Sequence, residues 1–298
     1  MKSRYRYFMT IGVAAAALFA QLASAQAPAP QAPQPSAGGA PGRGRGPGPV
    51  RQPDPRVQQR TYHFADADKD MPYALYVSSK VTKAKAAPLI VALHGMGGDH
   101  NSLLRGNAID LAEEGGYILV GPMGYNPQGW FGSPVIRPRR GGPGGQQASN
   151  DPPNLRELSE KDVINVLDLV RKEFNVDPQR TYLMGHSMGG AGTLVLGPKY
   201  ASNWAAIAAM APAAFAMLPT ATDLLTPIKS TMPVLLLQGD ADNVVPPDYA
   251  RRWAAAMKDL NMNYKYVEMP GEDHGTIIAK SMPEIFRYFD EHSKPATH

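Results

Sequence analysis

The stretch TYLMGHSMGGAGTL (residues 181–194) places one serine, Ser187, among four glycines, after an apolar run and before a glycine-rich segment. Residues 185–189, GHSMG, match the pattern G-x-S-x-G, in which a serine sits on a sharp turn between a strand and a helix. Glycines two residues before and after the serine leave room for such a turn. The pattern alone occurs by accident in chains of this composition, so the flanking strand and helix signals are what favour a nucleophilic serine over an incidental one.

Short apolar runs alternate with helical patterns along the rest of the chain. Strands are predicted at residues 87–95, 117–122, 180–185, 204–212, 232–239 and 264–271, and helices at 102–116, 159–174, 247–260 and 275–292. Ser159, with Asp162 three residues later, predicts a helix cap. Apolar strands separated by helices predict an α/β fold, with a mostly parallel sheet covered by helices on both faces. Ligand sites in such sheets lie beyond the carboxyl ends of the strands.

The first 60 residues differ from the rest in composition. Residues 1–25 combine a basic start, a short apolar run and the small-residue end ASA, which predicts a signal peptide and export to the periplasm or the medium. The alternative, a membrane anchor, is disfavoured because the apolar run is shorter than the ~20 residues a span requires. Residues 26–60 are rich in proline, glycine and alanine, which predicts a disordered linker before a catalytic domain at residues 61–298.

Charge and cysteine content narrow the class of protein. The chain has 30 basic and 26 acidic residues, but eight of the basic and one of the acidic residues precede residue 61, so residues 61–298 carry 22 and 25. The predicted domain is therefore mildly acidic, and nucleic-acid binding is not expected. The chain contains no cysteine, which excludes disulfides and thiolate metal sites. Motifs for metal or nucleotide binding are absent, so no metal and no cofactor are expected.

A nucleophilic serine needs a base and a carboxylate that orients this base. The segment QGDADNVVP (238–246) ends a predicted strand with Asp240 and Asp242, and GEDHG (271–275) places His274 after the next strand. The order serine, acid, histidine is the order found in α/β-hydrolases. The residues alone leave both aspartates open as the acid.

The motifs LHGMGG (93–98), VDPQRTYLMGHSMGG (176–190), GDADNVVP (239–246) and EDHG (272–275) resemble the α/β-hydrolase family, near secreted polyhydroxybutyrate-depolymerase-like and feruloyl-esterase-like enzymes. The resemblance implies the α/β-hydrolase fold and selects Asp242 as the acid, which leaves Asp240 to cap or support the turn.

The resemblance further implies an oxyanion hole formed by the backbone N–H groups of Met188, which follows the nucleophile, and of Met96. The segment GYNPQGWFG also resembles this branch, and it implies a substrate-stacking role for Trp130, against a structural one. His94 and His186 are expected to have structural roles. The long segment from residue 125 to 155 is expected to be a functional or mobile loop.

The sequence thus predicts a serine esterase in which Ser187, His274 and Asp242 cleave a small-molecule or polymeric ester through an acyl-enzyme, without stable membrane insertion once the signal peptide is removed. The alternatives are a prolyl-oligopeptidase-like serine peptidase, from a family that usually adds a propeller domain, and a non-catalytic protein that binds an envelope component or a polymer. The residues do not choose among phenolic, polyester, acetylated-sugar and small lipophilic esters.

Overall fold

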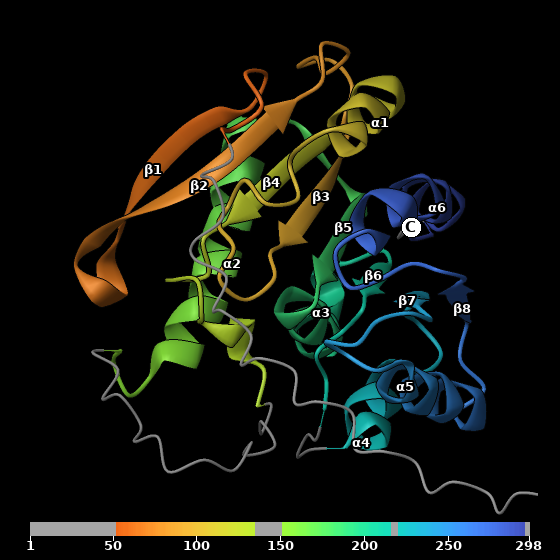
Figure 1. The fold of residues 1–298 in the computed structure, drawn as a ribbon. Helices are drawn as coiled ribbons and strands as arrows, with labels where there is room; N and C mark the ends of the chain where they lie inside the picture. The colour runs from red at the N-terminus through yellow and green to blue at the C-terminus, as the bar shows by residue number, and fades with distance from the viewer. Residues whose placement is uncertain (1–51, 135–150, 216–219, 296–298) are drawn as a thin grey trace, which may run out of the picture. The chain divides into compact units, whose positions relative to one another are not determined.

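One eight-stranded sheet, with strand order β1-β2-β4-β3-β5-β6-β7-β8, forms the centre of the computed structural model (Figure 1). Its strands are β1 (Gln58–Phe64), β2 (Lys69–Val77), β3 (Ala87–Leu93), β4 (Ile118–Pro122), β5 (Val176–His186), β6 (Ile207–Met210), β7 (Val234–Gly239) and β8 (Tyr264–Met269). The structure describes residues 52–134, 151–215 and 220–295, so the predicted signal peptide lies outside the described residues. Strands β3 to β8 are parallel, and β2 is antiparallel to both β1 and β4, which confirms the mostly parallel sheet.

Helices cover the sheet on both faces, as the alternating pattern predicts. The helices are α1 (Asn107–Gly115), α2 (Leu155–Glu173), α3 (Met188–Lys199), α4 (Ala221–Leu225), α5 (Pro247–Asp259) and α6 (Ile277–Glu291), with short 3-10 helices η1 (Ala65–Ala67), η2 (Trp130–Gly132), η3 (Ala201–Asn203) and η4 (Thr226–Ile228). Helices α1 and α6 pack on one face, and α2, α3 and α5 pack on the other (Figure 1).

Strand β3 shows why the central strands read as continuous apolar runs. All seven of its residues are buried. Leu89 and Val91 belong to the core shared with α2, α3 and α5, whereas Ile90 and Ala92 belong to the core shared with α1 and α6. Successive side chains of a strand point to opposite faces, so a strand covered on both faces needs an apolar residue at every position.

The amino-terminal edge of the fold differs from the sequence prediction. Strand β1 begins at Gln58, inside the range assigned to the linker, and Arg56 already pairs with Asp110 of α1 at 2.7 Å. Residues 52–60 are therefore part of the fold, and the predicted linker is too long at its end. The apolar pattern missed β1 because an edge strand exposes most of its side chains and carries polar residues.

Two predicted helix starts are also wrong. Helix α2 begins at Leu155 rather than at residue 159, so Ser159 is not a cap. It is instead buried in the second turn, where its Oγ accepts the N–H of Phe131 at 3.0 Å. Helix α1 begins at Asn107 rather than at residue 102, because Gly106, with a φ of 54°, ends the preceding turns.

The sheet brings three of the predicted site residues to one edge. Ser187 follows β5, and Asp242 and His274 follow β7 and β8, strands that run parallel in the same sheet. The carboxyl ends of parallel strands lie at the same edge, so turns far apart in sequence meet there. Within the described ranges, no helix has the length and apolar character needed to cross a membrane.

Candidate active site

Ser187 occupies the turn between β5 and α3. Its backbone has a φ of 57° and a ψ of −114°, a strained conformation for a residue with a side chain. The surrounding backbone holds it there: its N–H donates to the carbonyl of Met210 at 2.9 Å, and its carbonyl accepts the N–H groups of Ala191 at 3.0 Å and Ala213 at 2.9 Å. The single serine of the opening stretch therefore sits on a rigid turn at the carboxyl edge of the sheet.

The glycines on either side of Ser187 are required by close approach of the backbone. A Cβ at Gly185 would overlap the carbonyl group of Gly189, and a Cβ at Gly189 would overlap the carbonyl group of Leu93 in β3. Only glycine lets strand β5, helix α3 and strand β3 come this close. The G-x-S-x-G pattern is thus a packing requirement of the turn.

The imidazole of His274 contacts both Ser187 and Asp242. Its Nε2 lies 2.9 Å from the Oγ of Ser187, and its Nδ1 lies 2.7 Å from the Oδ2 of Asp242. An ionised carboxylate only accepts hydrogen bonds, so Nδ1 carries the proton and Nε2 is left to accept the serine hydroxyl. This arrangement can move a proton away from the hydroxyl of Ser187.

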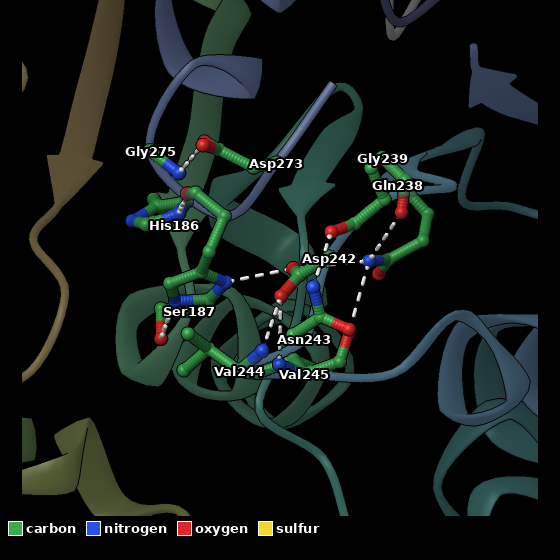
Figure 2. Close-up of polar contacts among 12 residues, drawn as sticks. His186, Ser187, Gln238, Gly239, Asp242, Asn243, Val244, Val245, Asp273 and Gly275 are labelled. Atoms are coloured by element: carbon green, nitrogen blue, oxygen red, sulfur yellow. Dashed lines mark hydrogen bonds and ion pairs between the residues drawn. The ribbon is translucent and has the colours of Figure 1, made fainter. Parts of the chain in front are cut away.

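Asp242 is buried but fully supplied with donors. Its side chain has 0% exposure, compared with 19% for the His274 side chain. Its Oδ1 accepts the N–H groups of Val244 and Val245, both at 2.8 Å, and its Oδ2 accepts the side-chain N–H of Gln238 at 3.1 Å (Figure 2). Burial alone would raise the pKa of Asp242, but the hydrogen bonds from His274 and the two valines lower it. The carboxylate is therefore held ionised beside the imidazole.

The structure distinguishes the roles of Asp240 and Asp242, which the residues alone left as alternative acids. The Oδ1 of Asp240 accepts the N–H of Gly271 at 2.7 Å, in the turn that precedes His274. Asp240 thus supports this turn, and Asp242 is the one that contacts the imidazole. The selection of Asp242 that the resemblance implies matches this geometry.

The turn after β3 lies against Ser187. A Cβ at Gly95 would come 3.4 Å from the Cβ of Ser187, so the backbone that leads into Met96 runs beside the serine. Met188 is the first residue of α3, and the first N–H groups of a helix have no acceptor within the helix. The described geometry is compatible with oxyanion donors at Met96 and Met188, which stay a prediction.

His94 and Gln238 support the site through hydrogen bonds to the backbone around it. His94 is buried, and its ring nitrogens lie 2.8 Å from the carbonyl oxygen of Gly95 and 2.9 Å from that of Met123, which agrees with the structural role expected for it. The sequence reasoning missed Gln238, whose Nε2 also lies 3.1 Å from the carbonyl oxygen of Val245. The signal was present, because a polar residue that ends the apolar run LLLQ at a carboxyl edge is a candidate for supporting the site.

Trp130 lies in the short helix η2, where it and Phe131 have φ angles of 61° and 46°. It borders a cleft of about 530 Å³ whose other lining residues are Gln128, Pro153, Asn154, Leu155, Arg156 and Glu157. Ser187, Asp242 and His274 are not among the residues that line this cleft. Trp130 packs against the core that contains Met188, and its role in substrate binding stays a prediction.

A mostly parallel sheet with a serine on the turn after its fifth strand, and with acid and histidine after the last two strands, defines an α/β-hydrolase fold. Residues 66–227 match the family described as "Putative esterase", and residues 219–295 match the family described as "Prolyl oligopeptidase family". The first match covers more than half of the 298 residues, and the chain belongs to this esterase family.

Individual relatives agree with this assignment. The chain is 30% identical over 154 residues to feruloyl esterase B of Neurospora crassa, with 49% of this chain and 47% of the relative covered. It is 29% identical over 153 residues to S-formylglutathione hydrolase of Rattus norvegicus, with 48% and 51% covered. The chain spans about half the length of the curated relatives it matches.

Among solved structures, an S-formylglutathione hydrolase from Agrobacterium tumefaciens has a TM-score of 0.64 at 17% identity, with 79% of this chain and 95% of that chain covered. At this identity the likeness concerns the fold.

Proposed function

We propose that this protein is an exported serine esterase that cleaves carboxylic esters with Ser187, His274 and Asp242. The observation that carries the proposal is the continuous hydrogen-bonded path from the Ser187 hydroxyl through His274 to the buried carboxylate of Asp242. Membership of the esterase family supports the ester as the substrate class. The sequence of residues 1–25 supports export.

The reaction follows from the positions of the protons. As the Oγ of Ser187 forms a bond to the carbonyl carbon of the ester, its proton moves to the Nε2 of His274. The negative charge that develops on the carbonyl oxygen is met by the backbone N–H groups of Met96 and Met188, and each such donor contributes about 3–4 kcal/mol in hydrolases where it has been removed. Collapse of the tetrahedral intermediate breaks the bond to the alcohol oxygen, which takes the proton from Nε2 and leaves as the alcohol.

Water completes the cycle. The Nε2 of His274 removes a proton from a water molecule, whose oxygen attacks the acyl carbon. Collapse of the second intermediate returns the proton to the Oγ of Ser187 and releases the carboxylic acid. Throughout, Asp242 keeps the Nδ1 proton in place and stabilises the imidazolium that forms transiently.

The surface around the site supports an ester with an apolar part. Among the described residues, the exposed large apolar side chains are those of Met96 and Val244, with 39% and 63% exposure. Met96 follows the turn that packs against Ser187, and Val244 donates its N–H to Asp242. We propose that these two side chains contact an apolar acyl or alcohol group of the substrate. The name of the relative feruloyl esterase B extends this proposal to phenolic esters.

The test is the rate of hydrolysis of p-nitrophenyl acetate by wild type and by Ser187→Ala. We expect Ser187→Ala to lose about 10⁴-fold or more in kcat while its thermal unfolding stays close to that of wild type. Retention of the wild-type rate by this variant would disprove the role of Ser187. Failure of a fluorophosphonate probe to label Ser187 would instead favour the non-catalytic binding protein.

A second candidate function is a serine peptidase, because residues 219–295, which contain Asp242 and His274, match the prolyl oligopeptidase family. A panel of esters and peptides with matched acyl groups separates the two functions. A serine peptidase also cleaves the more reactive esters, so the peptides decide: we expect no measurable hydrolysis of the peptides, and peptide turnover that Ser187→Ala abolishes would establish the peptidase.

A further inference from the structure

We propose that His186 is a positioning residue, whose side-chain N–H holds the backbone of His274 at the distance from Ser187 that proton transfer requires. The inference rests on the proposed function, since it assigns a role within the same reaction.

The two histidines are in direct contact. The Nε2 of His186 lies 2.7 Å from the carbonyl oxygen of His274, and the ring centroids are 4.6 Å apart. A carbonyl oxygen only accepts hydrogen bonds, so the Nε2 of His186 carries the proton and donates it to this oxygen. The contact links residues 88 positions apart in the sequence.

His186 itself has little freedom to move. It is the last residue of β5 and has 7% exposure. A Cβ at Gly95 would lie 3.1 Å from its Nδ1, so the ring is confined between the turn after β3 and His274. His186 directly precedes Ser187 on the rigid turn. Its side-chain N–H therefore ties His274, the base, to the same turn that carries the nucleophile.

The other contacts of the His274 loop lie within the loop or join it to the turn after β7, where the Oδ1 of Asp240 accepts the N–H of Gly271 and the N–H of Ala241 donates to the carbonyl of Glu272. The Oδ1 of Asp273 accepts the N–H groups of Gly275 and Thr276, both at 2.8 Å, which shapes the segment over two to three residues. Such local bonds determine how the loop is folded but not where it lies relative to β5. The bond from His186 crosses from one turn to the other and supplies this second constraint.

The charge of His186 is suited to the role. Burial, and then the neighbouring His274, lower the pKa of His186 to about 4, so its ring is neutral at neutral pH. During the reaction His274 becomes positively charged. A neutral donor beside it does not oppose this change, whereas a second imidazolium would repel it.

The test compares two amides that differ by one methylene. In His186→Gln the side-chain amide reaches the position of Nε2 and can still donate, whereas in His186→Asn it reaches only the position of Nδ1. Tyr182→Phe serves as the control on the same strand, because it removes one buried hydroxyl that has no partner among the described residues. The readouts are kcat and KM for p-nitrophenyl acetate, with active enzyme counted by fluorophosphonate titration and folding followed by thermal unfolding.

We expect kcat per active site to fall about 10–100-fold in His186→Asn with KM within about twofold of wild type, since misplacement of a reacting group by about 1 Å can cost 10²-fold. His186→Gln should stay within about threefold of wild type, and Tyr182→Phe should match wild type.

Equal kcat per active site in His186→Asn and His186→Gln would overturn the inference, as would a loss in His186→Asn that disappears after normalisation to active sites. A wild-type rate no higher than that of Ser187→Ala would sink the proposed function as well. If wild type is active but His186→Asn and His186→Gln have equal kcat per active site, this inference fails and the proposed function stands.

Discussion

The Oδ2 of Asp242 and the Nδ1 of His274 lie 2.7 Å apart, although 32 residues separate them and the carboxylate side chain has 0% exposure. Because its side chain is buried, this carboxylate depends on its protein partners for its hydrogen bonds. All of its partners are donors, so a neutral isostere that is itself a donor does not fit the same place.

Asp242→Asn is therefore expected to lower kcat about 10⁴-fold, the loss seen for the equivalent change in a serine protease, because the amide N–H₂ faces Nδ1 and selects the wrong imidazole tautomer. The matched control is Asp240→Asn, two residues away, in which the side-chain oxygen can still accept the N–H of Gly271. Its kcat should stay within about threefold of wild type. Steady-state kinetics on p-nitrophenyl acetate measures both, and a larger loss in Asp240→Asn would show that the acid is misassigned.

Gln238→Leu is expected to lower the free energy of unfolding by about 1–3 kcal/mol, because it leaves the buried carbonyl of Val245 without its side-chain donor. The same change removes a donor from Asp242, so kcat should also fall. Asn243→Ala is the control in the same loop, since Asn243 is exposed and its side chain donates to the nearby carbonyl of Ala241. Urea unfolding should place this variant within about 0.5 kcal/mol of wild type. Equal stability of Gln238→Leu and wild type would contradict the assigned role of Gln238.

Gly189→Ala is expected to destabilise the fold by several kcal/mol or to prevent folding, because its Cβ would overlap the backbone carbonyl of Leu93, which cannot rotate away. In Gly275→Ala the nearest atom to the new Cβ is the Oδ1 of Asp273 at 3.6 Å, an ordinary contact. This control should unfold at nearly the wild-type temperature. Thermal unfolding compares the two, and a stable Gly189→Ala variant would mean that α3 and β3 are less closely packed.

The stability of the protein is expected to fall in mild acid, partly through His186. The pKa of His186 is lowered to about 4 in the fold, from about 6.5 in an unfolded chain. Below pH 6.5 the unfolded state therefore binds a proton that the folded state does not, and stability is lost as the pH falls from 6.5 towards 4. The contribution between pH 7 and pH 5 is about 2 kcal/mol.

The measurement is the free energy of unfolding of wild type and His186→Gln at pH 7 and pH 5. Glutamine does not titrate, so the variant should lose about 2 kcal/mol less than wild type over this interval. Parallel losses in the two proteins would show that His186 does not titrate in the unfolding reaction as its burial requires.

The sequence by itself determined the features that are encoded locally. The continuous apolar run of β3 predicted a strand buried on both faces, because each of its residues must meet one of two cores. The glycines around Ser187 predicted the turn, because the close approach of three backbones excludes any Cβ at Gly185 and Gly189. Strand β1 escaped prediction, because an exposed edge strand carries no apolar pattern.

Only the tertiary structure decided which residues work together. Asp240 and Asp242 follow the same strand two residues apart, and it is the packing of the turn after β7 against the loop after β8 that brings Asp242 to His274 and turns Asp240 towards Gly271. The bond from His186 to the carbonyl of His274 likewise depends on the place of β5 in the sheet. No local sequence pattern predicts a backbone acceptor 88 residues away. Contacts of this kind arise from the order of strands in the sheet, which residue spacing alone does not encode.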